Sequence, residues 1–401
     1  MSSERPLTVL CIATYEKGQE FMRECRRQGC RVLLLTLDTL EHADWPRESI
    51  DQMFYLRRGA PIDDIVKGVS WMARTEVLDR IVALDDFDVE TAAFLREHLR
   101  VPGMGDSTAR YFRDKLAMRV KAHDHGIRVP PFAHVLNYDA LRAFMARVPG
   151  PWVLKPRSEA SAVGIRKIER ADDLWPALDT LGDRQSFYVL EKYVPGDVYH
   201  VDAIVWDREP VFVVSHKYGQ PPMDVAHGGG IFMTRRLHRD APERPALEAL
   251  TGKLLATLGF VRGVTHTEFI RDREDAEFYF LETAARVGGA HITDVVEAAT
   301  GVNLWAEWAR LEIAGEGGRY RVAPARDDYA GIVLSLARDD RPDTSSFNDP
   351  EIWYRVARSH HIGFVVASPD YDRVEHLLAD YSRRIAADHL ATAPVPDKPT
   401  A

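Results

Sequence analysis

The chain has 401 residues, 45% of them hydrophobic and 28% charged, which is enough for two or three packed units with their own cores. Its net charge of −9 argues against nucleic acid as a general partner. No apolar run approaches the roughly 20 residues of a membrane span, and we expect no signal peptide, because the chain passes from MSSERP directly into a strand-like run. We therefore expect a cytoplasmic protein that has no membrane partner.

Residues 1–102 alternate apolar, strand-like runs with helical stretches. This alternation predicts a Rossmann-like α/β domain with a parallel sheet. The loop after the first strand, ATYEKGQE, is not GxGxxG, so NAD binding is not predicted. Cys25 and Cys30 lack the further ligands that a zinc site needs. The predicted strands cover 7–13, 31–37 and 80–87, and the predicted helices cover 20–28, 62–78 and 89–99.

A boundary is predicted at VPGMGDS, because two glycines and a proline lie close together there. A helix over 108–125 follows, and then PWVLKP, VGIRKI, SFYVLEKYV and YHVDAIVWD, which we expect to be antiparallel strands of one sheet. This central unit runs over 103–325 and includes a glycine-rich loop at 217–230. Its later predicted elements are a helix at 244–258, strands at 264–270 and 277–283, and helices at 290–299 and 303–313.

A smaller α+β lobe is predicted over 326–390. It contains the strand-like runs YAGIVLSLA and HIGFVVASP and a helix over 370–386. Residues 391–401 are polar and proline-rich, and we expect them to be disordered. The predicted fold class is thus α/β plus α+β in three parts.

Two carboxylates, Glu268 in GVTHTEFI and Glu282 in EFYFLETAARVGG, are the most informative residues. They lie on two neighbouring strands that a charged turn at 271–276 joins, so a hairpin can bring both to one face. Two unpaired carboxylates repel each other, and a bound cation is the natural reason to keep them together. Lys115 and Lys155 could hold the phosphates that such a cation would bridge. The arrangement suggests an enzyme that uses a nucleotide.

Two further segments fit nucleotide binding weakly on their own. Lys155 ends WVLKP and precedes the small-residue loop RSEASAVG, whose amides could bind phosphate oxygens. A surface lysine is the plainer interpretation. In EKYVPGD the strand breaks at 191–197, where backbone groups could bind an adenine edge and an acid just beyond could reach a ribose. An ordinary strand end explains this segment equally well.

Arg286 offers a planar fork to a carboxylate, and Gly288 and Gly289 let the amides of a helix starting near Ala290 approach the same anion. His266 lies two residues from Glu268 and so shares its face of the strand. His266 would sit in the cleft beside the metal, unless it is a structural histidine. The pairs His123/His125 and His360/His361 are interpreted as surface features, because their spacings do not make them face each other.

Taken in order, these segments resemble the ATP-grasp superfamily. The resemblance rests on RDK at 113–115, VLKP at 153–156, LEKYVPG at 190–196, HTEF at 266–269 and LETAARVGG at 281–289, and it covers residues from about 1 to 390. The combination of GVTHTEF with E-x-x-x-R-x-G-G looks most like the carboxylate–amine ligases. These include the L-amino-acid ligases that form dipeptides.

The resemblance implies a role for each matching residue. Lys115 and Lys155 match the lysines that bind ATP phosphates, and Glu191 and Val194 match the hinge that holds adenine. Glu268 and Glu282 match the ligands of Mg²⁺, with Mn²⁺ as the alternative ion. Arg286 matches the arginine that grips a substrate carboxylate or the acyl phosphate. The candidate catalytic residues are therefore Glu282 and Arg286, together with His266, which its position on the face of Glu268 places in the cleft.

Two positions depart from the family pattern. Ala284 stands where the family has a metal-binding asparagine, which puts a second metal site in doubt. Val198 stands where the ribose-binding acid is expected, and Asp197 is its nearest substitute.

The implied activity is an ADP-forming ligase that phosphorylates a carboxylate and joins it to an amine, with the loop at 217–230 covering the acceptor side. Its partners would be the small-molecule carboxylate and amine, and a homodimer is left open. The alternatives are a biotin-carboxylase-like enzyme, a purine-biosynthetic ligase, and a nucleotide-binding regulator without catalysis. Ala284 keeps the last of these open.

Overall fold

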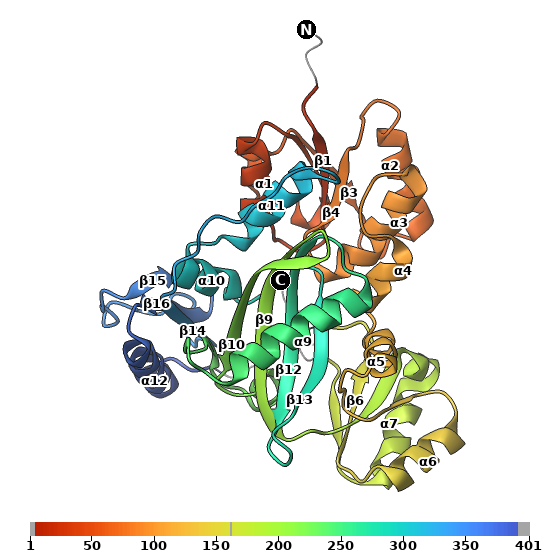
Figure 1. The fold of residues 1–401 in the computed structure, drawn as a ribbon, viewed down its shortest axis with the longest axis vertical. Helices are drawn as coiled ribbons and strands as arrows, with labels where there is room; N and C mark the ends of the chain where they lie inside the picture. The colour runs from red at the N-terminus through yellow and green to blue at the C-terminus, as the bar shows by residue number, and fades with distance from the viewer. Residues whose placement is uncertain (1–4, 161–162, 392–401) are drawn as a thin grey trace.

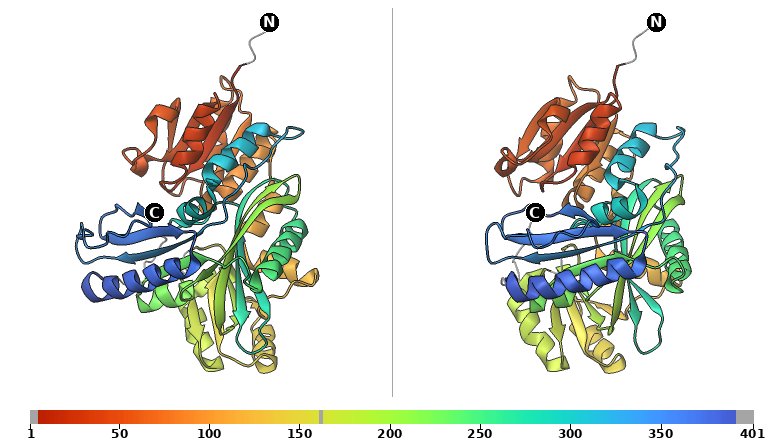
Figure 2. Two further views of the ribbon diagram at one scale, coloured as in Figure 1. Left: turned by 60° about the vertical axis from the view of Figure 1, so that its left-hand side comes forward. Right: turned by 90° about the vertical axis from the view of Figure 1, so that its left-hand side faces the viewer.

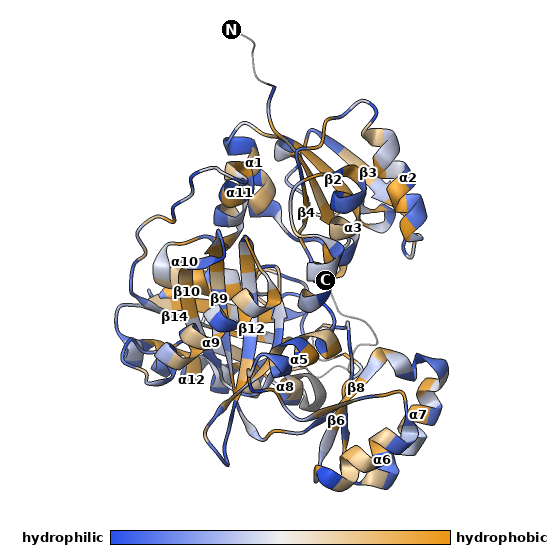
Figure 3. Ribbon diagram, turned by 45° about the vertical axis from the view of Figure 1, so that its right-hand side comes forward, coloured by the Kyte–Doolittle hydropathy of each residue, from blue (hydrophilic) through white to orange (hydrophobic). Residues whose placement is uncertain are grey.

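The computed structural model describes residues 5–160 and 163–391, and the described chain forms three sheets (Figure 1). We predicted that the tail over residues 391–401 is disordered. Residues 392–401 of this tail lie outside the described part. Among the described helices, none has the length and apolar character to cross a membrane. Hydrophobic residues concentrate along the strands, and hydrophilic ones on loops and on the outer faces of helices (Figure 3).

The N-terminal sheet is parallel, with the strand order β3-β2-β1-β4, which confirms the predicted α/β part. The side chains of strand β1 point alternately into two cores. Val9 and Cys11 pack toward α1, whereas Leu10 and Ile12 pack toward α2 and α3. The sequence did not indicate β3, which is a half-buried edge strand. The elements are β1 (Thr8–Ala13), α1 (Gln19–Arg27), β2 (Arg31–Leu37), β3 (Gln52–Leu56), α2 (Ile62–Met72), β4 (Arg80–Ala83) and α3 (Val89–Leu99).

The single helix predicted over 108–125 is wrong, because the chain breaks at Arg113 and Asp114. Asp114 is the N-cap of a new helix, and its carboxylate accepts hydrogen bonds from the backbone N–H groups of Leu116 at 2.9 Å and Ala117 at 3.3 Å. Lys115 is therefore the first residue of that helix. The segments are α4 (Asp106–Ala109), a 3₁₀ turn (Arg110–Phe112) and α5 (Lys115–Asp124).

A small antiparallel sheet follows, with the order β5-β8-β6-β7 and a core shared with α6 and α7. The prediction that residues 199–207 continue this sheet is wrong. The chain leaves this sheet after Lys192, and residues 199–206 instead pair with residues 209–217 and 263–269 in the large sheet. The elements are β5 (Phe132–His134), α6 (Tyr138–Arg147), β6 (Trp152–Pro156), β7 (Arg166–Ile168), α7 (Leu174–Leu181) and β8 (Tyr188–Lys192).

The third sheet has eight strands in the order β13-β12-β9-β10-β11-β14-β16-β15. Strands from both sides of residue 326 belong to it, so a domain boundary there stays a prediction. Helix α12 packs along the C-terminal strands (Figure 2). The strands are β9 (Gly196–Trp206), β10 (Glu209–Tyr218), β11 (Phe232–Arg236), β12 (Gly263–Asp272), β13 (Phe278–Ala284), β14 (Tyr329–Leu336), β15 (Ile352–Arg355) and β16 (His361–Ser368).

Helices fill the space around this sheet and tie it to the N-terminal domain. Helix α11 packs against α1, so a segment late in the sequence completes the N-terminal core (Figure 1). The segment 217–230, predicted as a loop, instead finishes β10 and contains a short helix. The helices are α8 (Pro222–Gly228), α9 (Glu243–Leu258), α10 (Ile292–Thr300), α11 (Leu304–Ala314) and α12 (Tyr371–Asp388).

Candidate functional site

A cavity of about 480 Å³ lies where the small sheet, the large sheet and the N-terminal domain meet. Its walls come from α5, β6, β12, β13 and the chain between β8 and β9. All but one of the residues proposed from the sequence line it: Lys115, Lys155, Glu191, Val194, His266, Glu268, Glu282 and Arg286. The exception is Asp197.

The two carboxylates that define the site face each other across the hairpin of β12 and β13. Glu268 and Glu282 are directly paired in the antiparallel register, which places their side chains on one face. The Tyr218 hydroxyl donates to Glu268 at 2.7 Å, and Lys115 Nζ lies 2.7 Å from Glu282. Burial by itself would raise the pKa of Glu282, but Lys115 and Lys155 outweigh it and hold that pKa below its usual value.

The two lysines reach the cavity from different elements. Lys115, at the start of α5, also donates from Nζ to the Glu159 carbonyl at 2.7 Å. Lys155 is the last residue but one of β6, and its Nζ lies 2.6 Å from Glu191. Burial lowers the pKa of Lys155 to about 8, although Glu191 opposes this shift. The small-residue loop after Lys155 is described except at residues 161–162.

Glu191 has a structural partner that the sequence interpretation missed. Arg119 Nε lies 2.8 Å from its carboxylate, and the Arg119 side chain is fully buried. Burial alone would raise the pKa of Glu191, but Arg119 and Lys155 outweigh it and lower the pKa. The side chain of Glu191 therefore holds Lys155 in place, and its backbone is paired with Val153 in the sheet. Arg119 could have been found, because it lies four residues after Lys115 on one helix face.

The chain between β8 and β9 forms the hinge wall of the cavity. The backbone N–H groups of Lys192 and Tyr193 donate to the carbonyls of Pro131 and Pro151 at 2.8 and 2.9 Å. These two donors are not free for a nucleotide. In the described structure, the Val194 N–H makes no such backbone hydrogen bond, and Val194 lines the cavity. The hinge position proposed for Val194 is therefore open to a ligand.

Asp197 lies on the wrong face of β9 for a cavity residue. Side chains alternate along a strand, so Gly196 and Val198 face the cavity and Asp197 faces away. Its carboxylate is 2.7 Å from Lys217 Nζ and accepts a hydrogen bond from Arg273 at 3.3 Å. The suggestion that Asp197 replaces the ribose-binding acid is not supported.

Arg286 reaches the cavity from the chain just after β13, and a carboxylate of the N-terminal domain already binds its guanidinium. Nε and Nη2 both donate to Asp86 Oδ2, at 2.8 and 2.6 Å, and Nη1 donates to the Val287 carbonyl. Burial would lower the pKa of Arg286, but Asp86 outweighs it and raises the pKa. The geometry shows that this fork can hold a carboxylate. The helix beyond begins at Ile292, two residues later than predicted.

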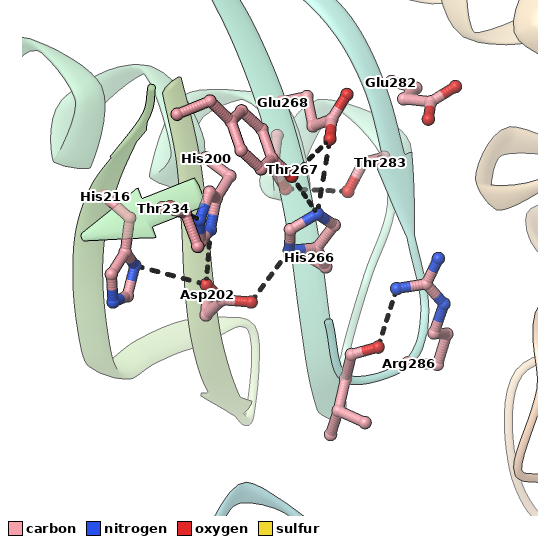
Figure 4. Close-up of polar contacts among 12 residues, drawn as sticks. His200, Asp202, His216, Thr234, His266, Thr267, Glu268, Glu282, Thr283 and Arg286 are labelled. Atoms are coloured by element: carbon pink, nitrogen blue, oxygen red, sulfur yellow. Dashed lines mark hydrogen bonds and ion pairs between the residues drawn. The ribbon is translucent and has the colours of Figure 1, made fainter. Parts of the chain in front are cut away.

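His266 connects the cavity to a polar cluster inside the large sheet (Figure 4). Its Nδ1 donates to Asp202 at 2.9 Å, and its Nε2 lies 3.5 Å from the Tyr218 hydroxyl and 3.6 Å from Glu268. Burial would lower the pKa of His266, but Asp202 and Glu268 outweigh it and raise the pKa to about 9. His266 therefore lies between two carboxylates, those of Asp202 and Glu268.

Besides Arg119, the sequence interpretation missed three residues that contact predicted ones: Asp86, Asp202 and Tyr218. Asp202 carried a weak signal, because an acid inside the apolar run VDAIVW needs a partner when it is buried. Asp86 and Tyr218 carried none, since each meets its partner only through tertiary packing. The paired histidines at 123 and 125 are exposed, as is His360.

No protein-family model matches the chain. The chain is 27% identical over 234 residues to an L-arginine-specific L-amino acid ligase of Bacillus subtilis, which covers 57% of this chain and 56% of that ligase. The match thus spans little more than half the length of that relative.

Two solved structures share nearly the whole architecture. An L-amino acid ligase from Bacillus licheniformis has a TM-score of 0.73 at 16% identity, covering 94% of this chain and 97% of that one. The biotin carboxylase domain of a Hydrogenobacter thermophilus 2-oxoglutarate carboxylase, solved with MgADP, ADP and bicarbonate, has a TM-score of 0.68 at 16% identity, covering 96% and 90%. This chain therefore has the fold of the ATP-grasp ligases, and 57% of it is similar in sequence to an L-amino acid ligase.

Proposed function

We propose that this protein is an ATP-dependent ligase that phosphorylates a carboxylate and joins it to an amine, releasing ADP and phosphate. One observation carries the proposal: a single cavity gathers two lysines, two paired carboxylates and an arginine that binds a carboxylate. The similarity to an amino-acid ligase makes amino acids the first substrates to test.

Glu268 and Glu282 fit a magnesium ion. Both offer carboxylate oxygens at paired positions, and Mg²⁺ in nucleotide enzymes is commonly held by one or two carboxylates and by the substrate phosphates. The side chain of Ala284 has no atom that could bind the ion, but Glu268 and Glu282 are both still present. When bound there, Mg²⁺ supplies positive charge that stabilises the transferring phosphoryl group.

The protein's own residues have distinct parts in this proposal. Lys155 and Lys115 would bind phosphate oxygens, and the Val194 peptide would meet the adenine edge. Arg286 would bind the substrate carboxylate or the acyl phosphate through its planar fork. A substrate anion there competes with Asp86, which occupies the fork in this structure. After the carboxylate attacks the γ-phosphate, the amine displaces phosphate from the resulting acyl phosphate, and the amide forms.

The proposal is tested by measuring ADP release from ATP and Mg²⁺ with pooled amino acids, followed by mass analysis of the product. We expect release that depends on the acid and the amine, with a product mass equal to their sum less one water. Glu282→Gln should remove most of this activity, because a charged ligand is lost at the phosphates.

Glu277→Gln is the matched control, since Glu277 lies in the same hairpin but is exposed. It should keep normal activity. If the protein binds ATP yet releases no ADP with any pool, it is a nucleotide-binding regulator and not a ligase. Full activity in Glu282→Gln would contradict the assigned site.

A further inference from the structure

A buried cluster of three histidines and one aspartate lies behind the cavity wall, on β9, β10 and β12. Its members are His200, Asp202, His216 and His266, and Asp202 is fully buried. The strand register explains the cluster: Asp202 pairs with His266, and His200 pairs with His216. Only His266 among the four lines the cavity.

The two oxygens of Asp202 serve different histidines. Oδ1 accepts a hydrogen bond from His266 Nδ1 at 2.9 Å, and Oδ2 accepts one from His200 Nδ1 at 2.8 Å (Figure 4). His200 is held in turn by the Thr234 hydroxyl, 2.7 Å from its Nε2. His216 stacks on His200 with ring centroids 4.5 Å apart, and its Nδ1 lies 3.4 Å from Asp202. The carboxylate is therefore fixed from several sides.

Hydrogen bonding explains this cluster better than a metal ion does. The nitrogen and oxygen atoms of His200, Asp202 and His266 lie within 4.8 Å of one another, as metal ligands would. However, their contacts of 2.8 and 2.9 Å are ordinary N–H···O hydrogen-bond lengths. A carboxylate that already accepts a hydrogen bond on each oxygen needs no ion to satisfy it.

We propose that Asp202 is a positioning residue for His266. It binds Nδ1–H of His266, so the other ring nitrogen, Nε2, is the one presented to the cavity beside Glu268 and Tyr218. His200 and Thr234 keep Asp202 from turning. This inference rests on the proposed function, because it assigns Nε2 to the space where that function places the reacting groups.

An asparagine at position 202 tests the assignment, since it has nearly the same shape. Its side chain has one acceptor oxygen and one NH₂ donor, so it can accept from His200 or from His266 but not from both. One imidazole must then change its protonated nitrogen or lose the bond. Because Asp202 acts through His266, Asp202→Asn should reduce kcat about tenfold or more and change KM for ATP little.

A double-mutant cycle separates positioning from general destabilisation. If Asp202 acts through His266, adding Asp202→Asn to His266→Gln should cause no further loss of kcat. Thr267→Val is the matched control, because Thr267 is buried on the same strand and bonds Thr283 instead. Any fall in kcat that Thr267→Val causes should multiply with the fall in kcat that His266→Gln causes. Losses from Asp202→Asn and His266→Gln that multiply fully would overturn the proposal.

Nuclear magnetic resonance of ¹⁵N-histidine-labelled wild-type protein gives a readout that does not need ligase activity. The His266 resonance, assigned by its absence in His266→Gln, should show a proton on Nδ1. An Nδ1 without a proton, or one equivalent of zinc in the purified protein, would overturn the assignment. If the activity screen fails while Nδ1 carries its proton, the ligase proposal falls and the positioning of His266 by Asp202 stands.

Discussion

Lys155 should take up a proton when the protein binds ATP. Its ammonium is buried and its pKa is lowered to about 8, mainly because burial disfavours the charged form. A triphosphate placed against Nζ adds negative charge and favours that form again, so the pKa rises on binding. Lys155→Met removes the titrating group and keeps most of the apolar stem.

The size of the effect follows from the pKa shift. If bound phosphate restores the usual pKa of 10.5, the protein takes up about half a proton per nucleotide at pH 8, about a tenth at pH 7 and about nine tenths at pH 9. Because the complex holds more protons than the free protein, affinity falls as pH rises. Between pH 7 and pH 9 the loss is about tenfold.

Calorimetric titration with Mg²⁺ and a nonhydrolysable ATP analogue measures this uptake. At one pH, the difference in enthalpy between two buffers of different ionisation enthalpy gives the number of protons exchanged. The difference between wild type and Lys155→Met isolates Lys155 from other titrating groups, and Lys67→Met, at an exposed lysine, is the control. Equal proton uptake by wild type and Lys155→Met at pH 8 would refute the reasoning.

Two further changes test the site and its support. Arg286→Lys keeps the charge but loses the planar fork that binds Asp86. The kcat/KM for the acid should therefore fall about tenfold or more, while ATP affinity stays nearly constant. Normal kinetics would show that only the positive charge of Arg286 matters, and not its fork. Asp114→Ala removes the N-cap of α5 and the ion pair with Arg157, and should lower the free energy of unfolding in urea by about 1–2 kcal/mol. An unchanged urea midpoint would contradict this.

The sequence alone predicted the residues whose signals are local. The parallel sheet follows from alternating apolar runs and helices, and the pairing of Glu268 with Glu282 follows from a hairpin only a few residues long. Lys115 and Lys155 were weak candidates alone and were identified through the order of several motifs, whereas Arg286 stands in a short motif with two glycines. In all these cases neighbouring residues restrict the backbone enough to place the side chain.

Contacts between distant segments could not be predicted in this way. Asp86 binds Arg286 across 200 positions, and Tyr218 reaches Glu268 across 50. Asp197 was misplaced because a shift of one residue along a strand moves a side chain to the opposite face. The sequence by itself therefore determined which groups a site would use, whereas tertiary packing decided their partners, because burial and charge depend on the segments that fold against each residue.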